Sequence, residues 1–193
     1  MFQGEPLIIG KYYFDPIHQD SICITSLKFY VALKDKHEVR YEDKVKLMVY
    51  DEENRHLTYH QNLTDISSEP ELYLGVDSIL NTCGALSGDL DPSLGMYWTW
   101  NTGYINVKIE GRSKNCSALK HEFQFHLGGY SGKYKGIRQV SLVAHDMAKC
   151  KMAIELGDFF AATDLREKPQ VMSPSDEGNR LATLFANTFH LIR

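Results

Sequence analysis

The chain has 193 residues, of which 43% are hydrophobic, and this length and composition fit a single globular domain. Its 21 basic and 25 acidic residues are spread along the chain and give a net charge of −4. No basic stripe is present that would neutralise phosphates, so we expect no nucleic-acid partner. No apolar run reaches the ~20 residues of a membrane-spanning helix, so we expect no transmembrane segment. The N-terminus has no signal-peptide pattern, as in a cytosolic protein or in the mature form of an exported one.

Alternation of apolar and polar residues predicts β-strands along most of the chain. The alternating segments, in chain order, cover residues 21–33, 44–50, 105–110, 119–127, 140–144 and 149–156. Polar and glycine-containing turns separate them, at 51–54, 111–115 and 128–132. One apolar and one polar face per strand is typical of antiparallel sheets. The sequence therefore predicts an all-β fold, an antiparallel two-sheet β-sandwich that occupies residues 1–193 as one domain.

Two segments depart from the alternating pattern. Residues 75–94 are rich in small and acidic residues, and we expect them to form a long irregular loop. Near the C-terminus, Ser173 is a suitable N-cap and Pro174 suits the first helical position. Apolar residues then recur at helical spacing, at Leu181, Leu184 and Phe185. This pattern predicts one C-terminal helix that packs on the sandwich.

Both tryptophans of the chain lie in the segment 95–104, just ahead of the strand predicted at 105–110. The alternation of that strand, carried backward, places Met96, Trp98 and Trp100 on its polar face. Large rings on that face need a covering partner, such as a loop, the helix or a ligand. A bulge at 101–103 would reverse the alternation. Packing of both tryptophans under the long loop is the alternative interpretation.

His126 is the histidine best placed to bind a metal. It alternates with Phe125 and Leu127, so we expect it on the polar face of its strand, near the strand's end. A neutral imidazole there could ligate a metal, and copper accepts imidazole and thioether ligands. A solvated histidine with no ligand role is the alternative, and the sequence holds no H-x-H or H-E-x-x-H motif.

Oxygen-bearing side chains cluster in the predicted loop, at Asp77, Asn81, Asp89 and Asp91. Oxygen ligands of this kind suit calcium, although their spacing does not match an EF-hand loop. Loops rich in Asp, Asn and Gly also use these residues to cap turns. Calcium binding and turn capping are both compatible with the sequence.

The four cysteines are Cys23, Cys83, Cys116 and Cys150, which allow three pairings if all are bridged. None belongs to a C-x-x-C motif, which argues against a thiolate zinc site or a thioredoxin-like redox centre. Four free thiols and at least one disulfide are both compatible with the sequence. No P-loop, Rossmann fingerprint or G-x-S-x-G motif occurs, so we expect no enzymatic activity.

Several short motifs together resemble the MbnP-like domain family. They are Leu74-Gly75-Val76-Asp77, Asn81, Gly88-Asp89-Leu90-Asp91-Pro92, Gly95-Met96-Tyr97-Trp98-Thr99-Trp100, Gly103-Tyr104, Glu110-Gly111 and His126-Leu127-Gly128. The motifs Gly4-Glu5-Pro6-Leu7 and Val171-Met172-Ser173-Pro174 also fit, so the resemblance extends over most of the domain. The combination of W-x-W with G-Y and a downstream H-L-G is fairly specific.

The resemblance implies a copper-binding β-sandwich protein that is periplasmic or lipid-anchored in the outer membrane, from a family first associated with methanobactin clusters. In characterised members, a di-haem partner related to cytochrome c peroxidases oxidises a tryptophan to kynurenine, which helps histidines to form a copper site. By this resemblance, Trp98 and Trp100 are the candidates for oxidation and His126 is the best-matched imidazole. Met96 is a candidate thioether ligand. The chain departs from the family pattern in having no second histidine beside the W-x-W segment.

Three functions therefore stand as hypotheses. The leading one is a copper-binding or copper-handling protein of the cell envelope. The second is an envelope module without a metal, whose surface tryptophans bind a glycan or a protein. The third is an interaction protein whose long loop is ordered by calcium.

Overall fold

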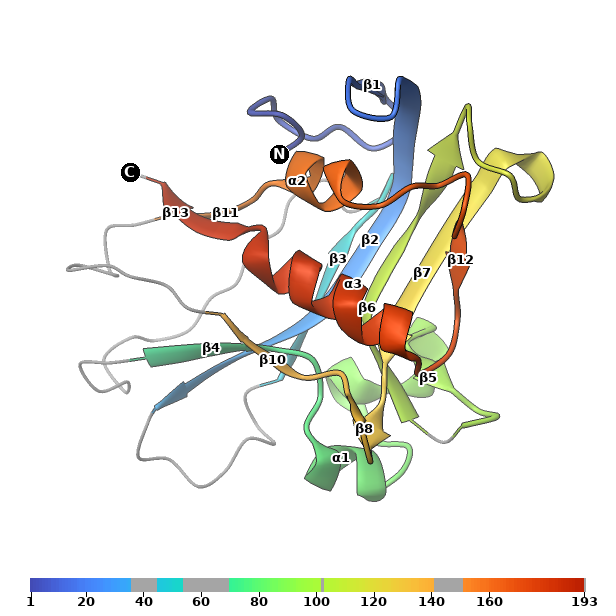
Figure 1. Cartoon of the computed structure of the whole chain (residues 1–193). Coiled ribbons are helices and arrows are strands. Elements are labelled where there is room, and N and C mark those ends of the chain that lie inside the picture. The colour runs from blue at the N-terminus through green and yellow to red at the C-terminus, as the bar shows by residue number, and fades with distance from the viewer. Residues whose placement is uncertain (36–44, 54–69, 102, 141–150, 193) are drawn as a thin grey trace.

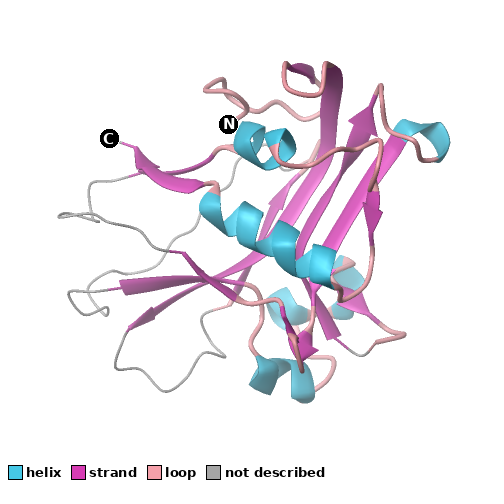
Figure 2. Ribbon diagram, in the orientation of Figure 1, coloured by secondary structure: helices cyan, strands magenta, loops and turns pink. Residues whose placement is uncertain are grey.

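The computed structural model describes residues 1–35, 45–53, 70–101, 103–140 and 151–192, and within these ranges strands dominate (Figure 2). The strands are β1 (Tyr12–Asp15), β2 (Asp20–Asp35), β3 (Lys46–Tyr50), β4 (Pro70–Leu74), β5 (Tyr97–Trp98), β6 (Gly103–Ser113), β7 (Glu122–Gly128), β8 (Tyr130–Ser131), β9 (Tyr134–Lys135), β10 (Arg138–Val140), β11 (Lys151–Ile154), β12 (Gln170–Val171) and β13 (Phe189–Ile192). The α-helices are α1 (Ser78–Thr82), α2 (Leu156–Ala161) and α3 (Asp176–Asn187).

Nine of these strands join one curled sheet, whose main path is β10-β4-β2-β6-β7-β12 (Figure 1). The long strand β2 is central, because β6 and β4 pair in succession along one edge and β1 and β3 pair along the other. β5 pairs with β6, and β12 pairs with β7 in parallel. β8-β9 and β11-β13 form two small sheets. The all-β class is therefore confirmed in a broadly sandwich-like form, but the predicted two-sheet antiparallel arrangement is not, because nine of the described strands form one curled sheet that includes a parallel pair.

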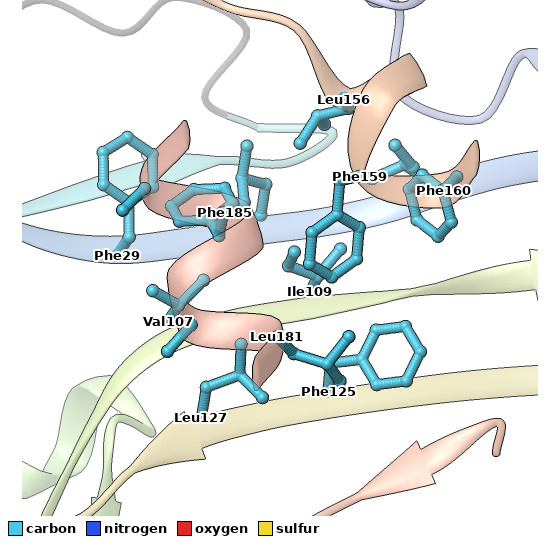
Figure 3. Packing of buried hydrophobic residues seen from close by; sticks show 14 of the residues in the cluster. Phe29, Val107, Ile109, Phe125, Leu127, Leu156, Phe159, Phe160, Leu181 and Phe185 are labelled. Carbon is cyan, nitrogen blue, oxygen red and sulfur yellow. The ribbon is translucent and has the colours of Figure 1, made fainter. Parts of the chain in front are cut away.

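Helices α2 and α3 cover one face of this sheet, and the larger hydrophobic core lies between the helices and the strands (Figures 1 and 3). Its buried side chains include Phe29, Val107, Ile109, Phe125 and Leu127 of the sheet, Phe159 and Phe160 of α2, and Leu181 and Phe185 of α3. The alternation in β6 and β7 and the helical spacing in α3 thus bring complementary apolar faces together. The predicted helix does pack on the sheet.

The start of α3 differs from the sequence prediction by two residues. Ser175, not Ser173, is the N-cap, and its Oγ accepts a hydrogen bond from the Gly178 amide at 3.0 Å. Asp176 and Glu177 occupy the first turn, where the helix dipole stabilises carboxylates. The local sequence offers two serines, and the cap is the one followed directly by acidic residues.

Replacing Glu177 with Gln is expected to make stability less dependent on acidic pH. Hydrogen bonds from the Arg180 guanidinium hold the pKa of Glu177 below its ordinary value of 4.5, so the ionised carboxylate stabilises the fold above that pH. This contribution is lost as the pH falls through the lowered pKa. Urea unfolding between about pH 7 and pH 3 should therefore show a shallower acid decline for Glu177→Gln than for the wild type.

Asp176→Asn is the matched control, because Asp176 lies in the same turn but pairs with Lys133 at the exposed surface. Exposed ion pairs contribute little to stability, so this variant should follow the wild-type pH profile. A Glu177→Gln profile that also follows the wild type would contradict the role assigned to Arg180.

Elsewhere, two predicted elements are changed. The strand predicted at 149–156 ends at Ile154, because the Glu155 carboxylate accepts a hydrogen bond from the Gly157 amide at 2.8 Å and starts α2. α3 is not the last element, since β13 follows it and pairs with β11. Of the strand predicted at 140–144, only Val140, the last residue of β10, lies within the described residues.

Within the described ranges, no helix combines the length and the apolar content that spanning a bilayer requires.

The segment 75–94 covers the opposite face of the sheet and packs against it in a second hydrophobic cluster. It contains α1 and two short 3-10 helices, where the sequence predicted only an irregular loop. The second cluster consists of Tyr30, Ala32, Val45, Val76, Leu80, Leu90, Met96, Trp98, Tyr104 and Ile105. Asn81 ties the segment to the sheet, because its Nδ2 donates to the carbonyl of Val76 and its Oδ1 accepts from the amide of Tyr104. These bonds fix the cover against β6.

Candidate functional site

A bulge in β6 breaks the predicted alternation between Ile105 and Val107. Ile105 pairs with Gly128 and Val107 pairs with Leu127, so Asn106 is an extra residue on β6. Ile105 consequently packs in the second cluster, while Val107 packs in the first. The alternation predicted from Ile105 onward therefore breaks at Asn106, outside the 101–103 segment where the sequence suggested a bulge.

Trp98 is buried, with 5% of its surface exposed, and Met96 of the same cluster is completely buried. The indole ring lies over Gly128, where an added Cβ atom would be 2.8 Å from Cζ3 of Trp98. Glycine at that position is what leaves room for the ring. Trp98 and Met96 are therefore covered and not exposed to solvent, as in the alternative interpretation of packing under the long loop, and the segment 75–94 is the partner that covers them.

Trp100 behaves differently, because 63% of its surface is exposed. Its ring centroid lies 5.8 Å from that of Trp98, and the two ring planes are inclined at 46°. A partner molecule can therefore reach Trp100 directly, whereas Trp98 is enclosed behind it. The solvent-facing position expected for both rings is found for Trp100 alone.

His126 is buried on the face of β7 that also carries Gly128, two residues further along. Because Trp98 covers Gly128, the imidazole and the buried indole belong to the same side of the sheet. Nε2 of His126 lies 2.8 Å from Oε1 of Glu110 on the neighbouring strand β6. Within the described chain, Nδ1 of this imidazole has no hydrogen-bond partner.

Glu110 is a member of the site that sequence reasoning missed. Its Oε1 also lies 3.4 Å from Nζ of Lys108, which is directly opposite His126 in the β6–β7 register. The hydrogen bond from His126 and the charge of Lys108 hold the pKa of Glu110 below its usual value. An ionised carboxylate can only accept this hydrogen bond, so Nε2 is the donor, and in the neutral imidazole Nδ1 then carries the lone pair.

The oxygen-bearing residues considered for calcium have local partners. Asp77 and Asp91 accept hydrogen bonds from backbone amides and cap α1 and a 3-10 turn. Asp89 lies 3.4 Å from Nζ of Lys46, and Asn81 makes the bonds described above. In the part of the chain that the structure describes, no three His, Cys, Asp or Glu side chains form a group that could hold a metal ion. The hydrogen bonds support turn capping.

The cysteines in the described ranges are free thiols. Cys23 and Cys116 are buried and Cys83 is exposed. Burial raises the pKa of the Cys23 and Cys116 thiols, which lowers their reactivity as nucleophiles. The fourth candidate, Cys150, lies outside the described residues.

These features define a β-rich, sandwich-like domain, one face of which carries a covered tryptophan and a histidine held by a carboxylate. The MbnP family model matches residues 1–173 of the chain. The chain therefore belongs to the MbnP family, and the resemblance based on the W-x-W, G-Y and H-L-G motifs is confirmed. No curated protein and no solved structure matches it.

Proposed function

We propose that this MbnP-family protein is exported to the cell envelope and handles copper on the sheet face that carries Trp98 and His126. The association of the family with the periplasm or the extracellular space supports export. The observation that carries the copper proposal is the 2.8 Å hydrogen bond between His126 and Glu110. Histidines that bind metals commonly donate their other ring N–H to a carboxylate, which fixes the tautomer and the ring orientation.

The donor atoms on this face suit copper. His126 offers an imidazole nitrogen, and Met96 offers a thioether in the cluster that also contains Trp98. These two side chains do not complete a coordination shell. The oxidised form of Trp98 would therefore be a further copper ligand. Bound copper would supply a redox-active centre, while Glu110 orients the imidazole and the apolar cluster excludes water.

The exposure of the two tryptophans supports a division of roles in the oxidation. A di-haem peroxidase-like partner, with hydrogen peroxide as the final oxidant, can reach the exposed ring of Trp100. Trp98 lies at a centroid distance of 5.8 Å and can replace the electron that Trp100 loses. In this proposal, Trp98 is therefore the residue converted to kynurenine, although it is buried. Two molecules of hydrogen peroxide supply the oxygen atoms and the four oxidising equivalents that cleave the C2–C3 bond of the indole to give N-formylkynurenine, with release of two waters. Hydrolysis of the formyl group then releases C2 as formate.

His126→Ala removes the proposed ligand and is expected to weaken copper binding by at least about tenfold. Glu110→Gln removes the carboxylate that orients the imidazole and should weaken copper binding by about 10–100-fold. Affinity is measured by competition with a Cu(I) chelator, using protein isolated from its native envelope. Elemental analysis and the mass of the peptide that contains both tryptophans are measured on the same preparation. The mass change for kynurenine should fragment to Trp98.

His121→Ala is the matched control, because His121 is exposed and bonds to the carbonyl of Cys116, away from Glu110. It should leave copper affinity unchanged. An unchanged affinity in His126→Ala would refute the copper site. A mass change confined to Trp100 would refute the assignment of kynurenine to Trp98 but not the role of His126.

A further inference from the structure

A hollow of about 300 Å³ opens beside Trp100, within the range of ~300–1,000 Å³ typical of small-molecule sites. Its lining includes the rings of Trp100, Tyr130, Tyr134 and Pro174, together with Ser131 and Ser173. The described residues that line it are uncharged, and the nearby Lys133 ammonium, 4.9 Å from the centroid of the Tyr134 ring, is paired with Asp176. Three aromatic residues and a proline therefore gather around one concavity and offer flat apolar surfaces on which a ligand can stack.

The hairpin β8–β9 forms one wall of the hollow. It places Ser131 directly opposite Tyr134. Gly129 precedes the hairpin with φ +113°, and an added Cβ would lie 2.7 Å from the carbonyl oxygen of Tyr134 and 3.2 Å from Cβ of Pro174. Glycine at this position therefore allows the hairpin and the segment before α3 to approach closely.

Contacts with α3 hold the hairpin in place. Nδ2 of Asn179 donates to the carbonyl of Lys133 at 2.9 Å, and the Lys133 ammonium lies 3.0 Å from the Asp176 carboxylate. Arg138, just after the hairpin, donates to the carbonyl of Asn179 at 3.0 Å. The aromatic wall is therefore arranged before any ligand arrives, which lowers the entropic cost of binding.

We propose that this hollow binds a neutral pyranose ring of a β-linked oligosaccharide. Such a ring has an apolar C–H face that stacks on aromatic side chains and a rim of hydroxyls that hydrogen-bond with serine and asparagine groups. The lining residues are uncharged and the Lys133 ammonium beside Tyr134 is paired with Asp176, which argues against phosphate or acidic ligands. Polyproline helices also dock on aromatic surfaces, but along extended grooves and not in a single concavity. The proposal is independent of copper, because it uses neither His126 nor Met96.

The test is titration of the full chain with cellotetraose and with chitotetraose, in the presence of EDTA, followed by tryptophan fluorescence and calorimetry. One of the two saccharides is expected to bind and to change the emission of Trp100. Trp100→Ala and Tyr134→Ala should each weaken that binding by at least about tenfold, which corresponds to ~1.4 kcal/mol. Trp100→Phe, which keeps a flat ring, should retain most of the affinity.

Two control variants localise the ligand. Leu119→Ala changes an apolar side chain that is 85% exposed on a separate 3-10 turn, and His126→Ala changes the proposed copper site. Both should bind saccharide as the wild type does. The proposal is overturned if neither saccharide binds, if Trp100→Ala binds normally, or if His126→Ala abolishes binding. Binding of hexaproline at Trp100 in place of both saccharides would also overturn it.

Discussion

Truncation of Trp98 to alanine is expected to lower the free energy of unfolding by about 3–5 kcal/mol. The same truncation of Trp100 should change it by no more than about 0.5 kcal/mol. The difference follows from burial, since Trp98 is 5% exposed and fills the space over Gly128, whereas Trp100 is 63% exposed. Removing the buried indole leaves a cavity between the sheet and its cover. Urea unfolding followed by far-ultraviolet circular dichroism measures both variants without relying on tryptophan emission.

Trp98→Phe provides an intermediate, because a smaller ring still covers part of Gly128. Its loss of stability should fall between those of Trp98→Ala and the wild type. In the single-tryptophan variants, a neutral quencher such as acrylamide should quench Trp100 emission strongly and Trp98 emission weakly. Equal destabilisation by the two alanine variants would contradict the position of Trp98 under the segment 75–94.

The burial of Trp98 could not be predicted from the sequence, because alternation placed the ring on the face of the sheet that carries His126, where it lies, but does not say what covers that face. The residue that alternation misplaced is Ile105, because the register breaks at Asn106. Oδ1 of Asn106 accepts a hydrogen bond from the amide of Val76 at 2.9 Å, a contact between residues far apart in the chain. A polar residue inside a regular alternation gives no local sign that it forms a bulge, so the sequence placed Ile105 on the same face as Val107.

The position of His126 was easier to predict than its environment. Phe125 and Leu127 do point into the first core, so the alternation gave the correct face for the imidazole. Its partner Glu110 lies on β6, two residues after Lys108, which is the residue paired directly with His126. Glu110 and His126 are therefore diagonal neighbours across β6 and β7. That relationship requires the exact strand register, which the sequence leaves open. Burial of the site likewise depends on the cover formed by the segment 75–94.

Local interactions were within reach of the sequence. Asp77 and Asp91 are each followed by a short helical turn whose amides their carboxylates cap, and turn capping was one of the two interpretations given to them. The start of α3 was placed within two residues for the same reason. In contrast, the hollow beside Trp100 combines the segments around Tyr130, Tyr134 and Pro174, which only the tertiary structure brings together.

Replacement of Phe185 by alanine is the second variant for which we expect a loss of about 3–5 kcal/mol. The side chain is completely buried, and its ring centroid lies 5.5 Å from that of Phe29, 6.4 Å from Phe159 and 5.4 Å from Phe189. It therefore joins α3 to β2, α2 and β13 at one point (Figure 3). Domains are commonly stable by only about 5–15 kcal/mol, so this loss should lower the urea midpoint strongly or unfold the protein.

Phe185→Leu and Asn187→Ala keep this prediction testable even if Phe185→Ala does not fold. Leucine retains most of the apolar volume, so its cost should be clearly smaller than that of alanine. Asn187 lies on the exposed side of the last turn of α3, and its truncation should stay within about 0.5 kcal/mol. The expected order of destabilisation is thus Asn187→Ala, Phe185→Leu, Phe185→Ala. If Asn187→Ala destabilised the protein more than Phe185→Leu, α3 would not pack on the sheet through the face that carries Phe185.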